Sequence, residues 1–457
     1  MKRLLLKNGK VVAEMGVVQT DLMIEGDTII NLGPCDAALE NCEVLDCSGK
    51  YILPGVIDAH VHFYMPVGPG IYTIDDFYSG SVAAACGGVT TVIDYVEPMD
   101  DQMPLDAVRE RRAEAEGSIA IDFSLHYVVR QWDSKYLQQL DQIVNDGLTS
   151  FKVFTTYEGM MLPYEAIHEL LKWCKDRGVL VTFHAEDDEI VTRATQKLLA
   201  SGVVYPSFHA DSRPAISEAE AVRKIINLAK SAGAPIYFVH VSSYEGAKVI
   251  QEARKDGLNV FAETCPHYLY LNSGIYKDSS DPQLYIMCPP LRDEGERASM
   301  WKAVTEGVFS VIATDHCAFS LEQKLQAKTF NETLAGIPGV ETLLPLMYQA
   351  VNTGEIDIVQ LTHFLSKNPA EIFGLYPRKG VIREGSDADL VVFDPEKEVV
   401  LKGSELHSKA GYTPFEGSKL KGYPQATILR GKIIYQDGVF IGEKGFGKFI
   451  PGQKFKV

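Results

Sequence analysis

The sequence of 457 residues predicts a (β/α)8 barrel, the TIM-barrel fold, joined to a β-sandwich domain built from both chain ends. Through the middle of the chain, apolar β-branched runs alternate with stretches of helical composition, which is typical of a parallel sheet with crossover helices. Eight such runs occur, the number of strands in this barrel. Short β-like runs separated by turn residues occupy both chain ends. An open, doubly wound sheet is the structural alternative for the middle part.

The first part of the β domain is expected at residues 1–54. Short apolar runs in this segment are separated by Gly, Asn and Asp, which favour turns, so the pattern indicates antiparallel strands and not βα units. The candidate strands are residues 4–6, 11–12, 21–24, 28–32 and 43–46.

The barrel is expected at residues 55–379, because the pattern changes after Pro54-Gly55 to apolar runs that are each followed by a helical segment. Parallel strands connected by helices are the arrangement that this alternation favours. The eight candidate strands are residues 56–62, 90–95, 119–127, 150–154, 179–184, 235–241, 258–263 and 308–314.

The second part of the β domain is expected at residues 380–457, where the turn-rich pattern returns. Its candidate strands are residues 388–393, 398–401, 426–429 and 432–435. Because the two chain ends share this pattern, the simplest interpretation is one small β domain into which the barrel is inserted.

The composition limits the possible partners of the protein. Hydrophobic residues make up 46% of the chain and charged residues 23%, the balance of a soluble globular protein, and no apolar run approaches the ~18 residues of a membrane span. The formal net charge of -17 repels phosphate backbones and anionic lipids, so we expect neither nucleic acid nor a membrane as partner. The eight cysteines are scattered without a Cys-x-x-Cys pair, which favours reduced thiols and a cytoplasmic protein.

Residues that can bind metals end several predicted barrel strands, at the face where the active sites of such barrels lie. Alternation along the first strand sends both of its histidines to the same side. The complete set is His60, His62, Lys152, His184, His240 and Asp315. Four imidazoles and a carboxylate can hold two divalent cations. Lys152 offers no lone pair as an ammonium, but as a carbamate formed with carbon dioxide it would bridge two metals ~3.5–4 Å apart.

Eight sequence blocks contain these residues and their neighbours. They are DAHVH (58–62), SFKVFTTY (150–157), FHAE (183–186), VHVS (239–242), ETCPHYL (263–269), PPLR (289–292), TDHC (314–317) and GSDADL (385–390). Taken together and in this order, the blocks resemble the cyclic amidohydrolases, and most closely the dihydropyrimidinases and hydantoinases. The combination is highly specific, although each block alone is not.

The resemblance implies a centre of two divalent metal ions, usually zinc, bridged by a carboxylated lysine. By position, one metal would be bound by His60, His62 and Asp315, the other by His184 and His240, and the bridge would be Lys152. The resemblance also implies a small cyclic amide as substrate and a homo-oligomer, commonly a tetramer.

The reaction implied by the resemblance is hydrolysis of a ring C–N bond, which gives an N-carbamoyl amino acid. Two cations would lower the pKa of a bridging water and polarise the ring carbonyl. Tyr157 matches the tyrosine that stabilises the oxyanion, and Asp315 would carry the proton from the water to the ring nitrogen. Backbone contacts with the substrate are expected at Cys288, where the family has a serine, and near Gly339, where the family's asparagine is missing. His316 is expected to orient Asp315 or the substrate.

Related functions have different sequence signatures. Dihydroorotases carry an arginine two residues after the second histidine, but Tyr64 occupies this position. Allantoinases are closer, because CPHYL at 265–269 and GVET at 339–342 resemble that branch, whereas Tyr157 favours the hydantoinases. Non-catalytic scaffold relatives have lost metal ligands that are all present in this sequence.

The loop at residues 63–73 bears on the substrate, because it follows the first barrel strand. It is apolar and aromatic and lacks a cation, and a charged ring carboxylate without one would be costly to bury. We therefore expect a neutral ring with a small or apolar substituent, such as dihydrouracil, dihydrothymine or a 5-substituted hydantoin.

Overall fold

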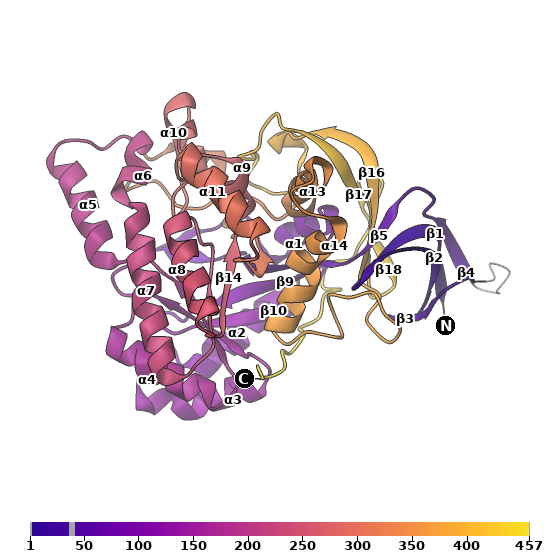
Figure 1. Ribbon diagram of the computed structural model, residues 1–457, viewed down its shortest axis with the longest axis horizontal. Coiled ribbons are helices and arrows are strands. Elements are labelled where there is room, and N and C mark those ends of the chain that lie inside the picture. The colour runs from indigo at the N-terminus through magenta and orange to yellow at the C-terminus, as the bar shows by residue number, and fades with distance from the viewer. Residues whose placement is uncertain (1, 36–41, 457) are drawn as a thin grey trace.

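The computed structural model describes residues 2–35 and 42–456, and its middle part is a nearly closed barrel of eight parallel strands (Figure 1). Around the sheet the strands follow their order in the chain: β6 (Val56–Val61), β9 (Val89–Val96), β10 (Asp122–Val128), β11 (Ser150–Phe154), β12 (Leu180–His184), β13 (Ile236–Phe238), β14 (Val260–Thr264) and β15 (Val311–Ile312). A single bridge between Val61 and His316 connects the two ends of the sheet, and there the His62 N–H donates to the His316 carbonyl at 2.8 Å. The predicted barrel is confirmed.

Helices cover the outside of the barrel (Figure 1). The longer ones are α1 (Phe77–Cys86), α2 (Pro104–Glu116), α3 (Leu137–Asn145), α4 (Tyr164–Lys175), α5 (Asp188–Ala200), α7 (Ala215–Ala232), α8 (Tyr244–Lys255), α11 (Glu294–Thr305) and α13 (Leu343–Thr353). Helix α4 shows why these segments pack on the sheet, because Ile167, Leu170, Leu171 and Cys174 recur at helical spacing and are all buried. No helix in the described ranges is long and apolar enough to cross a membrane.

Short elements fill the connections between the strands and helices. They are α6 (His209–Ser212), α9 (Pro266–Tyr270), α10 (Ile275–Asp278), α12 (Leu321–Leu325), α14 (Ile358–Thr362), α15 (Asn368–Ile372), the 3-10 turns η1 (Ser134–Tyr136), η2 (Pro206–Phe208), η3 (Pro282–Tyr285) and η5 (Gly403–Glu405), the π-helical turn η4 (His363–Lys367), and the hairpin of β7 (Pro66–Gly68) and β8 (Ile71–Tyr72). Most of them lie on the strand-to-helix side of the barrel, where predicted site residues end the strands.

Strands from both chain ends form one nine-stranded sheet beside the barrel (Figure 1). Its strands are β1 (Arg3–Ala13), β2 (Gly16–Glu25), β3 (Thr28–Leu32), β4 (Cys42–Asp46), β5 (Tyr51–Pro54), β16 (Leu390–Val400), β17 (Lys419–Leu429), β18 (Lys432–Gln436) and β19 (Val439–Phe440). Leu4, Leu22, Leu390 and Ile428 belong to one buried cluster, so both chain ends share a core.

Most neighbouring strands of this sheet are antiparallel, as the turn-rich pattern predicts, but β4 and β5 run parallel to β1. Strand β1 pairs with β4 at residues 3–7 and with β5 at residues 10 and 11, and its register shifts between Leu6 and Gly9. A Cβ at Gly9 would lie 2.3 Å from the Ile52 side chain. The absence of a side chain at Gly9 therefore lets β5 approach at the point where the sheet branches.

A buried cluster of charges joins the β domain to the barrel. The Lys379 Nζ lies 2.6 Å from the Asp122 carboxylate at the start of β10 and 2.5 Å from the Asp389 carboxylate just before β16. Arg430, after β17, adds a second cation 3.2 Å from Asp122. Buried carboxylates require such partners, so these contacts fix the relative position of the two units.

The carboxy-terminal segment, residues 446–455, leaves the β domain and lies against the barrel. Phe449 forms a bridge with Phe123 in β10, and the Gly452 N–H donates to the Gly147 carbonyl at 2.8 Å. The Phe455 N–H donates to the Gly178 carbonyl, just before β12, at 2.7 Å. The segment therefore crosses the amino-terminal ends of the strands, the face opposite the predicted site.

Candidate metal centre

A cavity of about 880 Å³ opens at the carboxyl ends of the barrel strands. Its lining includes every metal ligand expected from the sequence, together with Tyr157 and Cys288. The expected metal ligands in the lining are His60, His62, Lys152, His184, His240 and Asp315. Three of them lie in β6, β11 and β12, and the other three closely follow β6, β13 and β15, so the convergence follows from the barrel and not from proximity in the chain.

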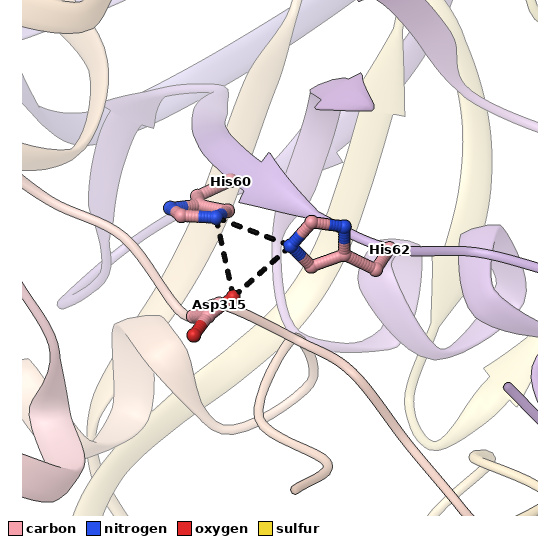
Figure 2. A group of neighbouring side chains, drawn as sticks. All are labelled: His60, His62 and Asp315. Carbon is pink, nitrogen blue, oxygen red and sulfur yellow. Dashed lines mark hydrogen bonds and ion pairs between the residues drawn. The ribbon is translucent and has the colours of Figure 1, made fainter. Parts of the chain in front are cut away.

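His60, His62 and Asp315 form the tightest group in this cavity (Figure 2). The Asp315 Oδ1 lies 3.2 Å from the Nε2 atoms of both histidines, and these two nitrogens are 3.2 Å apart. Asp315 has a φ of 52°, a left-handed conformation that turns its side chain back toward the strand ends. Burial would raise the pKa of Asp315, but the neighbouring histidines hold it below its usual range.

Glu263 orients this group from below. Its carboxylate accepts a hydrogen bond from the His60 Nδ1, the Tyr237 hydroxyl at 2.7 Å and the His240 N–H at 3.1 Å. Because the Nδ1–H of His60 is directed at Glu263, the lone pair of Nε2 faces Asp315 and His62. The three atoms that face one another here are all electron-pair donors, and they do not carry enough protons for a hydrogen bond at every contact. A metal cation bound between them would satisfy all three.

His184, His240 and Lys152 occupy the other half of the cavity floor. The ring centroids of His184 and His240 are 4.6 Å apart, and those of His60 and His240 are 5.4 Å apart. His184 Nε2 lies 2.8 Å from the Glu186 carboxylate, which leaves Nδ1 as the free lone pair. The Nδ1 of His240 is buried without a hydrogen-bond partner among the described residues.

Lys152 is 1% exposed and lies between aromatic rings, with its Nζ 5.3 Å from the Tyr95 centroid and 5.1 Å from the Phe154 centroid. Burial lowers the pKa of Lys152 to about 8. A neutral amine is therefore accessible near neutral pH, which is the form that can react with carbon dioxide. The donor set of the whole cavity fits two divalent cations with a bridging carbamate.

The sequence model of the amidohydrolase family matches residues 51–434. The chain belongs to the amidohydrolase family. Its similar relatives include the D-phenylhydantoinase of Escherichia coli O1:K1, 38% identical, and the D-hydantoinase of Ralstonia pickettii, 35% identical, each covering 99% of both chains. The solved dihydropyrimidinase from Brevibacillus agri NCHU1002 is 33% identical over 100% of both chains, with a TM-score of 0.96. A D-hydantoinase (dihydropyrimidinase) from Thermus sp. is 36% identical over 99% of both chains, with a TM-score of 0.96.

Tyr157, the expected oxyanion donor, forms one side of the cavity. Tyr157 has a φ of 76°, and its ring lies 5.1 Å from the ring of His184. Its hydroxyl accepts a hydrogen bond from Arg213 at 3.1 Å. The structure therefore brings the predicted oxyanion donor next to the predicted metal ligands, as the amidohydrolase resemblance requires.

Gly339 is not brought to this cavity, in contrast to the expectation from the sequence. Its N–H donates to the His316 Nδ1 at 3.1 Å, and its carbonyl accepts from the Thr342 N–H at 3.0 Å. Both backbone groups are thus engaged within this segment, and Gly339 lies outside the cavity lining. Among the described residues, the segment that lines this part of the cavity is 331–336.

His316 is placed as expected, next to Asp315 and behind the cavity. Its Nε2 lies 3.2 Å from the buried Asp75 carboxylate, and its Nδ1 accepts the Gly339 and Val340 N–H groups. Asp75 also accepts from the Lys409 N–H at 2.9 Å, in the segment between β16 and β17. Hydrogen bonds on both ring nitrogens fix the plane of His316 and, through the adjacent peptide, the position of Asp315.

Reasoning from the sequence missed several residues that orient the ligands. Glu186 and Glu263 lie inside blocks that carry the resemblance, so position relative to a histidine was an available signal for both. Arg213 comes from the loop after α6 and has no local pattern that marks it. Arg130 also lines the cavity, but its guanidinium contacts the Pro98 carbonyl at 2.8 Å and Asp100 at 2.8 Å.

Proposed function

We propose that this chain hydrolyses a ring C–N bond of a 5-substituted hydantoin or a dihydropyrimidine and releases an N-carbamoyl amino acid. The observation that carries this proposal is the convergence of four histidines, a lysine, an aspartate and Tyr157 on one cavity. The family and the full-length similarity to D-hydantoinases support hydrolysis of a cyclic amide.

The centre proposed for this cavity holds two divalent metal ions, with Zn²⁺ as the metal. His60, His62 and Asp315 would hold one ion, His184 and His240 would hold the other, and Lys152 in its carboxylated form would provide the shared ligand. When bound, the pair of ions would supply a water of low pKa and polarise the ring carbonyl. Neutral imidazoles and carboxylates are the ligands that zinc prefers.

The side chains of the cavity divide the proton and charge movements between them. Tyr157 donates its hydroxyl hydrogen to the carbonyl oxygen of the ring as negative charge develops there. Asp315 accepts a proton from the attacking water, and it returns the proton to the ring nitrogen that departs. Glu263 holds His60 in one tautomer throughout, because its hydrogen bond to Nδ1 does not change in the reaction.

The walls of the cavity favour an apolar ring substituent. Beyond the floor, the lining is rich in methionine and aromatic side chains: Met65, Tyr72, Met99, Phe154, Met160, Met287 and Phe319. Methionine adapts to irregular apolar shapes and contacts aromatic rings favourably. Arg130, a cation of the lining, is paired with Asp100, so a substrate carboxylate gains no free partner from it. The ring itself is proposed to contact the backbone at Cys288.

The assembly and location of the protein are also proposals. By resemblance we infer a homotetramer. We place the protein in the cytoplasm because all eight cysteines are free and no two of them are disulfide-bonded in the described residues.

The test is a substrate panel at equal metal loading. Turnover and kcat/KM are measured for dihydrouracil, 5-benzylhydantoin, allantoin and dihydroorotate, with Asp315→Asn as the inactive control. We expect one of the first two rings to be hydrolysed best and the variant to be inactive on all four. The highest kcat/KM on allantoin or dihydroorotate would contradict the proposed substrate class, and activity without divalent metal would contradict the metal centre.

A further inference from the structure

Arg213 connects the two functional halves of the cavity wall. Its Nε lies 3.0 and 3.1 Å from the two oxygens of Glu186, and its Nη2 lies 2.5 Å from Glu186 Oε2. The same Nη2 donates to the Tyr157 hydroxyl at 3.1 Å. Arg213 is 9% exposed and Glu186 is fully buried, so these contacts are shielded from water.

The hydrogen bond from Arg213 determines where the Tyr157 hydroxyl can donate. A phenol has one hydrogen, and an arginine can only donate, so the Tyr157 oxygen must accept in this pair. The Tyr157 hydrogen is therefore free to point away from Arg213. Tyr157 and Cys288 both line the cavity, where a substrate carbonyl oxygen can accept this hydrogen.

Glu186 connects Arg213 to His184, one of the proposed metal ligands. Its carboxylate takes the hydrogen bond of His184 Nε2 at 2.8 Å while it is held by the Arg213 guanidinium. The carboxylate acceptor at Nε2 keeps the hydrogen of His184 there and leaves Nδ1 for a metal.

We propose that Arg213 is a positioning residue that sets both the direction of the Tyr157 hydroxyl and the tautomer of His184. This inference rests on the proposed function, because the two groups are needed together only if Tyr157 stabilises an oxyanion next to the metal centre. Residues that hold ligands in this way typically contribute 10–100-fold to metal affinity or activity. A guanidinium suits the task because its planar fork serves a carboxylate and a hydroxyl at once, whereas an ammonium is a single point.

The first experiment is a double-mutant cycle on kcat with the zinc-loaded enzyme. Arg213→Gln is expected to lower kcat about 10–100-fold in the wild-type background. In the Tyr157→Phe background the same change is expected to lower kcat less than about threefold, because the hydroxyl that Arg213 orients is already gone. An equal loss in both backgrounds would overturn the role of Arg213 toward Tyr157.

The second experiment measures metal affinity by competition with a chelator, without any substrate. Arg213→Gln and Glu186→Gln are each expected to weaken the binding of one of two Zn²⁺ ions about 10–100-fold. Unchanged affinity in both variants would overturn the role toward His184. If the wild-type protein hydrolyses no cyclic amide, the proposed function is wrong. The chelator titration would still show whether Arg213 supports metal binding through His184.

Two further variants distinguish a specific role of Arg213 from a general loss of stability. Arg213→Gln alone leaves Glu186 buried without its cation, so the pair Arg213→Gln and Glu186→Gln, which removes both charges, is measured beside it. Arg254→Gln is the control, because Arg254 is a partly buried arginine that donates to Gly307 and Ser310 at the opposite barrel face. The control is expected to retain kcat and metal affinity, and a loss equal to that of Arg213→Gln would show a general effect of removing a buried arginine.

Discussion

The burial of Lys152 determines which chemistry its amine can perform. It sits in β11 with Phe151 and Val153 buried on either side, and it is itself almost fully buried at the floor of the cavity. A lysine in such a position normally costs stability, because burial disfavours the ammonium form. In the proposed centre, reaction with carbon dioxide would convert the amine into a carbamate, an anion that divalent cations would stabilise.

We expect Lys152→Ala to lose both metal ions and activity, because the remaining ligands lack a bridge. Short carboxylic acids such as acetate or propionate should restore part of the activity by taking the place of the carbamate. Metal content by elemental analysis and turnover with and without added acid check this outcome. Full metal occupancy and normal turnover in the variant without acid would contradict the proposed bridge.

Tyr157→Phe removes a single hydroxyl and is expected to lower kcat by about 10²–10³-fold, the effect of losing one oxyanion donor. The metal content should stay at the wild-type level, because Tyr157 is not a ligand. Steady-state kinetics on the best substrate of the panel measure the effect. Tyr127→Phe serves as control, because Tyr127 is also buried but lies outside the cavity lining. A loss of less than about threefold in Tyr157→Phe would exclude the role.

At the residue scale, the ligands were predictable because strand alternation and strand ends restrict where a metal site of this barrel can lie. His60, in β6, and His62, just after its end, illustrate this, since residues two positions apart on an extended chain point to the same face. Gly339 lies outside the cavity lining, because the segment after Asp315 folds back and the Gly339 N–H donates to His316. The role of Arg213 could not be predicted from the sequence, because its contacts join three separate segments and depend on how the loops between them fold.

At the scale of elements, the short helix α12 stabilises the rim of the cavity. Its Lys324 is fully buried, and the Nζ donates to the carbonyls of Ile286, Leu334 and Gly336 at 2.9, 2.7 and 3.0 Å. Leu334 and Gly336 line the cavity, and Ile286 immediately precedes the lining residues Met287 and Cys288. One lysine thus ties together two rim segments that are about 50 residues apart in the chain.

We expect Lys324→Met to lower the free energy of unfolding by about 1–3 kcal/mol, because three buried carbonyls lose their shared donor. The KM should rise more than kcat falls, since the rim holds substrate and not the metals. Chemical denaturation and steady-state kinetics measure the two effects. Lys328→Met is the control, because Lys328 is exposed and donates only to the Leu325 carbonyl at 3.2 Å. Unchanged stability and KM in Lys324→Met would contradict this role.

The type and order of the barrel elements were predictable, but their exact extent was not. Strand β15 covers only Val311–Ile312, although the apolar run extends from 308 to 314, because the chain must leave the sheet to place Asp315 and His316. In the β domain, turn residues predict reversals but not partners. Pairing of β1 with both β4 and β5 depends on the branch at Gly9, which no local pattern reveals.

At the scale of the whole molecule, we propose the division into residues 1–54 and 380–457 as one β domain and residues 55–379 as the barrel. The shared sheet of β5 and β16 supports it, and residues 446–455 of the second segment cross over to pack on the barrel. Besides the cluster around Lys379, the segment between β16 and β17 contacts the barrel through His407. Its N–H and Nδ1 lie 2.7 and 2.8 Å from the two oxygens of Glu341.

This contact predicts a pH dependence of stability. The hydrogen bond and charge of Glu341 raise the pKa of His407 above 6.5, although burial of Glu341 raises its own pKa and partly opposes the pair. A raised pKa in the folded state means that the contribution is fully present below pH 6.5 and is lost as the pH rises through the folded pKa. Because His407 is partly exposed, we expect the contribution to be at most about 1 kcal/mol.

Denaturation midpoints of wild type and His407→Gln at pH 6 and pH 9 check this expectation. The variant should be less stable than wild type at pH 6, and the difference should shrink at pH 9. His168→Gln is the control, because His168 is bonded only to the Ser231 hydroxyl at 3.1 Å and should show no such difference. A difference of equal size at both pH values would show that ionisation of His407 plays no part.

The path of the carboxy-terminal segment has a consequence for attaching this protein to a solid support. Residues 446–455 cross the amino-terminal ends of the barrel strands, and Lys454 is exposed there, with its Nζ 3.1 Å from the Asn145 side chain. The cavity opens at the other ends of the same strands. Molecules coupled to a bead through this segment would therefore turn their entrances toward the flowing solution, whereas coupling through the rim would turn them toward the bead.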